Sequence, residues 1–72
     1  MTADNPISPH FIDAARTAAR YGKTIRTIDR WLEDGRLAFP RPLHIGRMRF
    51  WRIADLEAWE TAQAERSAEA AA

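Results

Sequence analysis

The fold of this chain is decided by residues 22–35, which read GKTIRTIDRWLEDG. Thr24 is a good N-cap, because a threonine side chain accepts a hydrogen bond from a free backbone N–H of the first turn. Apolar residues at 25, 28, 31 and 32 recur at helical spacing, so the pattern predicts a helix over residues 25–34 with one buried stripe. The opposite side of this helix is polar and basic: it comprises Arg26, Thr27 and Arg30, and Lys23 stands just before the helix.

A second helix is predicted just upstream, over residues 14–21. Phe11 and Ile12 lead into Asp13, which is a favourable N-cap, and the following run AARTAARY is rich in helix-forming residues. Gly22 suits the position after the helix, where the backbone turns left-handed. Two short helices joined by a glycine-containing turn are the signature of a helix-turn-helix.

The chain changes character downstream, between residues 36 and 52. Two prolines in the run FPRP at 39–42 block a helix there. The short runs 43–45 and 48–51 predict a β-hairpin around Gly46 and Arg47. Alternation places Met48 and Phe50 on one face of the second strand and Arg49 and Trp51 on the other, which leaves the packing face of Trp51 open.

A third helix is predicted from Ala54 to about Ala64, with Leu56 and Trp59 facing inward. We therefore expect a mainly α chain with a small β-hairpin: a winged helix-turn-helix of three helices and a two-stranded wing. Residues 1–10 are expected to form a flexible arm and residues 11–61 the folded domain. Residues 62–72, rich in alanine and glutamate, are expected to extend the helix or to be disordered.

The composition narrows the chemistry that this chain of 72 residues can perform. It has no cysteine and two histidines, His10 and His44, without acidic partners at ligand spacing, so we expect no metal and no cofactor. No nucleophile motif or phosphate-binding loop is present, and we expect no enzymatic activity. No apolar run reaches the length of a membrane span, and the first ten residues do not resemble a signal peptide. A reducing cytoplasm is compatible with these features.

Charge is distributed unevenly along the chain although the formal net charge is only +1. Residues 16–52 hold ten arginine or lysine residues against three acidic ones, and residues 53–72 hold one arginine against five. Nine of the ten central cations are arginine, whose planar guanidinium suits phosphate and guanine recognition. The pattern predicts a basic surface for a polyanion; an ordinary solvated charged face is the alternative.

The helix over residues 25–34 is the best candidate to read DNA in the major groove. Arg26 and Arg30 are four residues apart and share a face, and arginine bonds guanine O6 and N7 in a bidentate manner. Thr27 is a candidate for a base-edge contact, and Lys23 and Thr24 lie at the helix N-terminus, where phosphates bind. The alternative is that Arg26 and Arg30 pair with nearby acids, which are Asp29, Glu33 and Asp34.

The hairpin supplies a second set of candidate contacts. Arg47 at its tip and Arg49 on its second strand are expected to reach the DNA backbone or a narrow minor groove. Arg41 and Arg52 are weaker candidates, for phosphate contact. The large aromatic residues are expected to pack in the core rather than stack on unpaired bases; they are Trp31, Phe50, Trp51 and Trp59.

Residues 13–59 resemble the AlpA-like regulators and small excisionases, or recombination directionality factors, which have a MerR-like winged-helix domain. The matching features are Gly22 with the capping Thr24, T-I-x-R-W at 27–31, glycine at 35, F-P-x-P at 39–42, the Gly46-Arg47 tip and W-R-x-x-x-L-E-A-W at 51–59. The family usually has serine or threonine as the last helix cap, and here Ala54 stands there. It also has a bulky residue within the first helix, where this chain has residues 17–19, TAA, so a thinner core is expected.

The resemblance implies binding to double-stranded DNA by a helix in the major groove with the wing beside it. In excisionases several copies bind neighbouring sites, bend the DNA and help a tyrosine recombinase to excise an integrated element. Head-to-tail self-association on DNA is implied with that role. A transcriptional regulator of a mobile element is the alternative, and the two share every candidate contact. A protein-interaction module without DNA binding is a third hypothesis, which the basic helix face disfavours.

Overall fold

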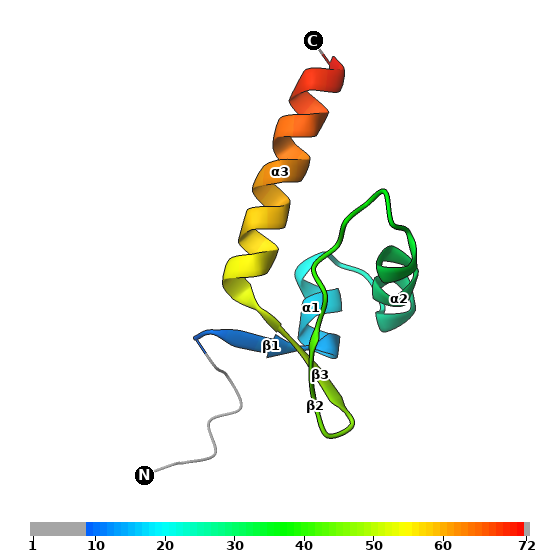
Figure 1. Cartoon of the computed structure of the whole chain (residues 1–72), viewed down its shortest axis with the longest axis vertical. Helices are drawn as coiled ribbons and strands as arrows, with labels where there is room; N and C mark the ends of the chain where they lie inside the picture. The colour runs from blue at the N-terminus through cyan, green and yellow to red at the C-terminus, as the bar shows by residue number, and fades with distance from the viewer. Residues whose placement is uncertain (1–8, 72) are drawn as a thin grey trace.

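The structure, a computed structural model of the chain, describes residues 9–71 (Figure 1). The first eight residues of the expected arm and residue 72 lie outside the described residues. The elements follow in the order β1 (Phe11–Asp13), α1 (Ala14–Arg20), α2 (Ile25–Glu33), β2 (Leu43–Ile45), β3 (Met48–Arg52) and α3 (Ile53–Ala71). Three helices and a small antiparallel sheet confirm the predicted fold class of a small helix-turn-helix with a wing.

The helix-turn-helix is built by local capping interactions. Asp13 accepts a hydrogen bond from the Arg16 backbone N–H at 2.9 Å and so begins α1. After α1, Gly22 has φ +67°, and the N–H groups of Gly22 and Lys23 donate to the carbonyls of Ala19 and Ala18. This pair of bonds is a Schellman motif, which ends a helix where glycine adopts the left-handed conformation.

The sheet has three strands, in the order β1-β3-β2, and not the two that the sequence predicted. β1 pairs with the central strand in the register Phe11↔Arg52 and Ile12↔Trp51. Beyond the strand, the Ile53 N–H donates to the His10 carbonyl at 2.9 Å and so satisfies one free donor at the start of α3. The predicted cap position Ala54 is wrong, because α3 begins at Ile53 and Ala54 lies inside its first turn.

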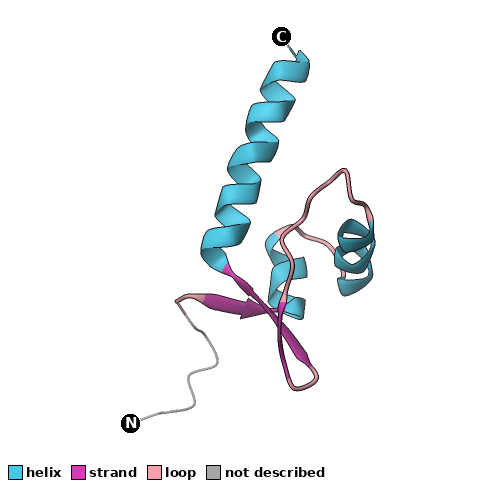
Figure 2. Cartoon of the chain, in the orientation of Figure 1, coloured by secondary structure: helices cyan, strands magenta, loops and turns pink. Residues whose placement is uncertain are grey.

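The wing is formed by β2 and β3, which are joined by the two residues Gly46 and Arg47 (Figure 2). Gly46 has φ +59° and Arg47 does not have a positive φ, which is the pattern of a type II′ turn. Figure 1 shows that the wing projects beyond α1 and α2, at the end of the molecule opposite the free end of α3.

The core lies between the inner face of the sheet and the helices. Trp51, Ile28 and Leu56 are fully buried there, together with Ala18 and Phe39. Tyr21, Trp31 and Trp59 pack against this core and make edge or tilted ring contacts with centroids 5.4–5.8 Å apart. Because Trp51 is fully buried, its side chain lies on the inner face of β3. The sequence had left this face open.

Two details of the predicted packing are wrong, and one buried residue was not predicted either way. Ile25 was expected in the buried stripe of α2, but it is 41% exposed at the first helical position. Thr17, whose packing was not predicted from the sequence, is fully buried, with its hydroxyl donating to the Asp13 carbonyl at 2.8 Å. Phe50 was expected in the core and is half-buried on the outer face of the sheet instead.

Candidate nucleic-acid interface

The exposed face of α2 carries most of the predicted contacts. Thr24 accepts a hydrogen bond from the Thr27 backbone N–H at 3.4 Å and so begins the helix. Ile28 is the buried anchor, and at about 100° per residue Arg26 and Arg30 lie on the far side of the helix from it. Lys23, Thr24, Arg26 and Arg30 are exposed and Thr27 is half-buried.

The acids near α2 form no ion pair with the cations of this face within the described residues, although exposed Glu33 lies on the same side of the helix. Within residues 9–71, the ion pairs join Arg20 to Glu60, Arg36 to Asp34 and Arg49 to Asp29, and none involves Lys23, Arg26 or Arg30. Asp29 is turned toward the wing, and Asp34 accepts from the Arg36 backbone N–H at 3.1 Å. The exposed guanidinium groups of Arg26 and Arg30 are therefore available for an external anion.

The two wing arginines that the sequence grouped together have different surroundings. Arg47 is exposed at the tip. Arg49 points inward: its Nη1 donates to Asp29 Oδ1 at 2.7 Å, and its guanidinium lies 5.6 Å from the Trp51 ring centre. Its side chain is 24% exposed. The structure therefore places Arg47 outward and uses Arg49 to join the wing to α2.

Arg41 and Arg52 are exposed and lie close to each other, away from α2. Both line a pocket of about 320 Å³ with Phe11, Pro42, Leu43 and Asp55. Neighbouring strand residues in register share a face, so Arg52 lies on the outer face of the sheet beside Phe11. The structure therefore does not bring these two arginines to the basic face of α2.

A polar cluster fixes the helix-turn-helix against α3. Glu60 accepts hydrogen bonds from Arg20 Nη2 at 2.9 Å and from the Tyr21 hydroxyl at 2.6 Å. The hydrogen bond from Arg20 lowers the pKa of Glu60 below its ordinary value, and burial together with the Glu60 contact raises the pKa of Tyr21. Because Tyr21 immediately precedes the turn, this cluster sets the position of the turn relative to α3.

A long connection joins α2 to β2 (Figure 2). Two tryptophan indole groups donate hydrogen bonds to its backbone. Trp51 Nε1 donates to the Pro40 carbonyl at 2.8 Å, and Trp59 Nε1 donates to the Leu37 carbonyl at 2.9 Å. Phe39 is buried between them, with its ring centre 4.9 Å from that of Trp59. These contacts hold the connection in place and so determine the position at which β2 begins.

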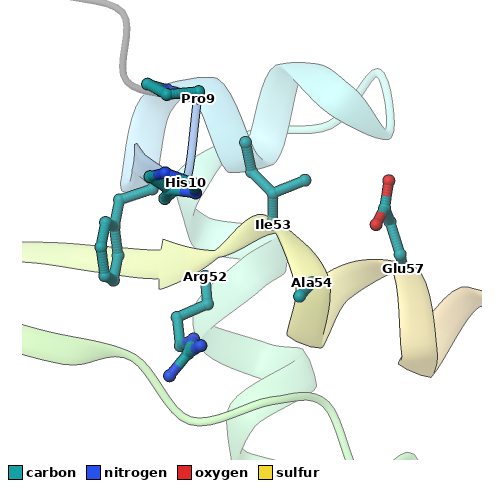
Figure 3. Close-up of a pocket in the computed structure, with 7 residues that line it drawn as sticks. Pro9, His10, Arg52, Ile53, Ala54 and Glu57 are labelled. Atoms are coloured by element: carbon teal, nitrogen blue, oxygen red, sulfur yellow. The ribbon is translucent and has the colours of Figure 1, made fainter.

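A second pocket, of about 390 Å³, lies where β1 meets the start of α3 (Figure 3). Arg52 and Glu57 point to different sides of it, and Ile53 and Ala54 lie between them. Figure 1 places this region on the side of the molecule away from α2. The pocket is therefore separate from the candidate DNA-binding face; its lining residues are Pro9, His10, Phe11, Arg52, Ile53, Ala54 and Glu57.

Other kinds of site have no counterpart in the described part of the chain. Over residues 9–71 no group of three histidine, cysteine or acidic side chains is placed to hold a metal ion. None of the helices described there is long and apolar enough to cross a membrane. Comparison with protein-family models, curated proteins and solved structures finds no match to this chain.

Sequence reasoning missed two features of this surface. The sequence offers Asp29 as a possible partner of Arg26 or Arg30, whereas its partner in the structure is Arg49, twenty residues away in sequence. The exposed apolar pair Ile45 and Met48 beside the wing tip was not singled out. The alternation of the hairpin contained the signal, because placing Trp51 inward forces Met48 and Phe50 outward.

Proposed function

We propose that this chain binds double-stranded DNA, with α2 in the major groove and the wing beside it. The observation that carries the proposal is the pair Arg26 and Arg30, exposed and without an ion pair within the described residues, on the side of a capped helix opposite its buried anchor Ile28. Thr24 and Lys23 add donors at the N-terminus of that helix, where phosphates are favoured. Arg47 adds a second basic point at the wing tip.

The role that we propose is that of an excisionase, or recombination directionality factor, which binds and bends attachment-site DNA for a tyrosine recombinase. The resemblance of residues 13–59 to that family supports this role. A transcriptional regulator of the AlpA type is the second candidate, since it uses the same DNA-binding residues. Cytoplasmic action at the nucleoid and head-to-tail assembly of copies on DNA belong to the same proposal.

DNA binding is tested by titrating labelled duplexes, recovered by the protein from a random-sequence pool, at increasing salt concentration. Each neutralised phosphate releases counterions, so the logarithm of the affinity is expected to fall with the logarithm of salt with a slope of about −0.9 per phosphate. Arg66→Ala is the matched control, because Arg66 is an exposed arginine on α3 outside the proposed interface. A flat salt response, or equal weakening by Arg66→Ala and Arg30→Ala, contradicts the proposal.

The two biological roles are separated by an excision assay with a tyrosine recombinase and its attachment-site DNA. A directionality factor stimulates excision and bends the attachment-site duplex. Binding without stimulation or bending, combined with altered transcription from a nearby promoter, favours the regulator instead. If no duplex binds, an interaction module that retains the fold becomes the better interpretation.

A further inference from the structure

The outer face of the wing is apolar at the point nearest its tip. Ile45 and Met48 are paired residues on either side of the two-residue turn, so their side chains lie next to each other on one face of the sheet. Ile45 is 58% exposed and Met48 is 52% exposed. Neither belongs to the core or to the residues packed against it. The fold itself therefore does not explain why this pair is apolar.

An exposed apolar hairpin edge is unfavourable unless something covers it. Antiparallel hairpins ordinarily place polar residues on the solvent side, and exposed strands with apolar side chains promote aggregation. β2 is such an edge strand, because it pairs with β3 on one side only. Ile45 and Met48 on the same projecting tip therefore indicate an external binding partner.

The charges around Ile45 and Met48 indicate which kind of partner binds there. Arg47 is exposed at the wing tip between Ile45 and Met48, and the hairpin residues 43–52 contain three arginines, one of them paired with Asp29 of α2, and no acidic residue. Such a surface complements a polyanion. With Leu43 and Phe50 beside the pair, the outer face of the hairpin offers four apolar side chains, far fewer than the roughly 20–30 residues per side of a stable protein interface. Proteins that bend DNA through the minor groove combine arginine with an apolar wedge of this kind.

We propose that Ile45 and Met48 form an apolar wedge that enters the minor groove beside Arg47 and opens a base step, so that the wing bends the DNA. This inference rests on the proposed DNA binding and names the side chains that bend the duplex. The Arg49–Asp29 contact at 2.7 Å fixes the wing against α2, so that α2 in the major groove aims the tip at the adjacent minor groove. The wedge replaces base stacking at one step with contacts to the two side chains.

The wedge is tested on a short duplex recovered by the wild-type protein from a random-sequence pool. Dyes at the two ends report bending by energy transfer, and 2-aminopurine next to the kink reports unstacking. The wild-type protein is expected to bend the duplex by about 20–90° and to raise the 2-aminopurine fluorescence. The double variant Ile45→Ala/Met48→Ala is expected to lose most of the bend and the fluorescence increase, with about a tenfold loss of affinity.

Two control variants keep the test specific. Leu43→Ala removes an exposed apolar side chain from the same face farther from the tip, and it is expected to bend DNA like the wild type. Ile45→Leu keeps an apolar side chain at the tip and is expected to retain the bend. Circular dichroism of the double variant is expected to match the wild type, because both positions are exposed.

The outcomes distinguish failure of the wedge from failure of DNA binding. If the wild-type protein binds no duplex, the proposed function and the wedge both fail. If the double variant binds and bends like the wild type, only the wedge is overturned. An altered sedimentation coefficient of the double variant with an unchanged bend overturns the wedge as well, and assigns the apolar tip to contact between copies of the chain.

Discussion

Arg49 Nη1 and Asp29 Oδ1 lie 2.7 Å apart and join the wing to the helix that carries the basic face. Asp29 is on α2 and Arg49 is on β3, and the Arg49 guanidinium also lies over the Trp51 ring. Both side chains are partly exposed, at 48% and 24%, so the pair adds little to stability. Within residues 9–71 it is the ion pair that joins the wing to α2.

Breaking this pair is expected to change stability only slightly. Asp29→Ala, Arg49→Ala and the double variant, compared by urea unfolding, are expected to give a coupling energy of about 0.5–1 kcal/mol, as for a partly exposed ion pair. A coupling energy of several kcal/mol would show that the pair is part of the core. The Arg36–Asp34 pair, 3.9 Å apart and with Arg36 almost fully exposed, is the matched control.

The same variants separate a joining role for Arg49 from direct contact with DNA. If Arg49 acts by holding the wing, Asp29→Ala and Arg49→Ala are expected to weaken duplex binding by similar factors, since either change releases the wing. If Arg49 itself contacts a phosphate, Asp29→Ala releases the guanidinium and is expected to strengthen binding. Fluorescence anisotropy on one duplex at fixed salt distinguishes these results.

Trp51 is expected to be the most sensitive core position for a conservative change. In Trp51→Phe the smaller ring leaves a gap beside Phe39, and the Pro40 carbonyl loses its indole donor. We expect a loss of about 2–3 kcal/mol in the free energy of unfolding, a large share for a small domain. Phe50→Leu on the outer face of the same strand is the control, and an equal loss there would contradict this assignment of the core.

The features that the sequence predicted well are those that depend on neighbouring residues. The caps at Asp13 and Thr24, the turn at Gly22 and the hairpin turn at Gly46 each depend on a few adjacent positions, and the structure has all four. Helical spacing also identified Ile28 as an anchor of α2. Local hydrogen bonds and allowed backbone angles decide these features, so one segment contains the information.

The features that the sequence did not predict depend on partners far along the chain. β1 is only three residues long, and its pairing with β3 joins residues about forty positions apart. Burial of Thr17 depends on α2 and the sheet packing against α1 rather than on the helix pattern of residues 14–20. The pairing of Asp29 with Arg49 depends on the packing of the wing against α2. Tertiary packing, rather than local preference, decided each of these.

Acid is expected to destabilise the chain through Glu60. In the folded chain, the Arg20 hydrogen bond first, and the Tyr21 hydroxyl after it, hold the pKa of Glu60 below its ordinary value of 4.5. The unfolded chain therefore binds a proton at higher pH than the folded chain does. The stabilisation from this group is present above about pH 4.5 and is lost as the pH falls through the lower, folded pKa.

Glu60→Gln tests this pH dependence because glutamine has no titrating carboxyl. The difference in the free energy of unfolding between the wild type and this variant is expected to be largest near pH 7 and to shrink as the pH falls below 4.5. Urea unfolding at a series of pH values measures it. A difference that stays constant over that series would mean that Glu60 stabilises the fold through packing and not through its charge. Glu65→Gln, on the exposed end of α3, is the control.

Arginines on α2 and at the wing tip are expected to affect DNA recognition in different ways. Arg26 and Arg30 lie on the exposed side of α2, so Arg26→Ala or Arg30→Ala is expected to reduce the preference for the selected site by about 1–3 kcal/mol. Arg47→Ala is expected to weaken binding to all duplexes alike and to reduce the salt slope by about 1, because a wing-tip contact to the backbone carries little sequence information. The measurement is competition between the selected duplex and a scrambled one of equal length, with Arg66→Ala as the control. Equal losses on both duplexes for all three variants would show that α2 contacts only phosphates and that sequence preference arises elsewhere.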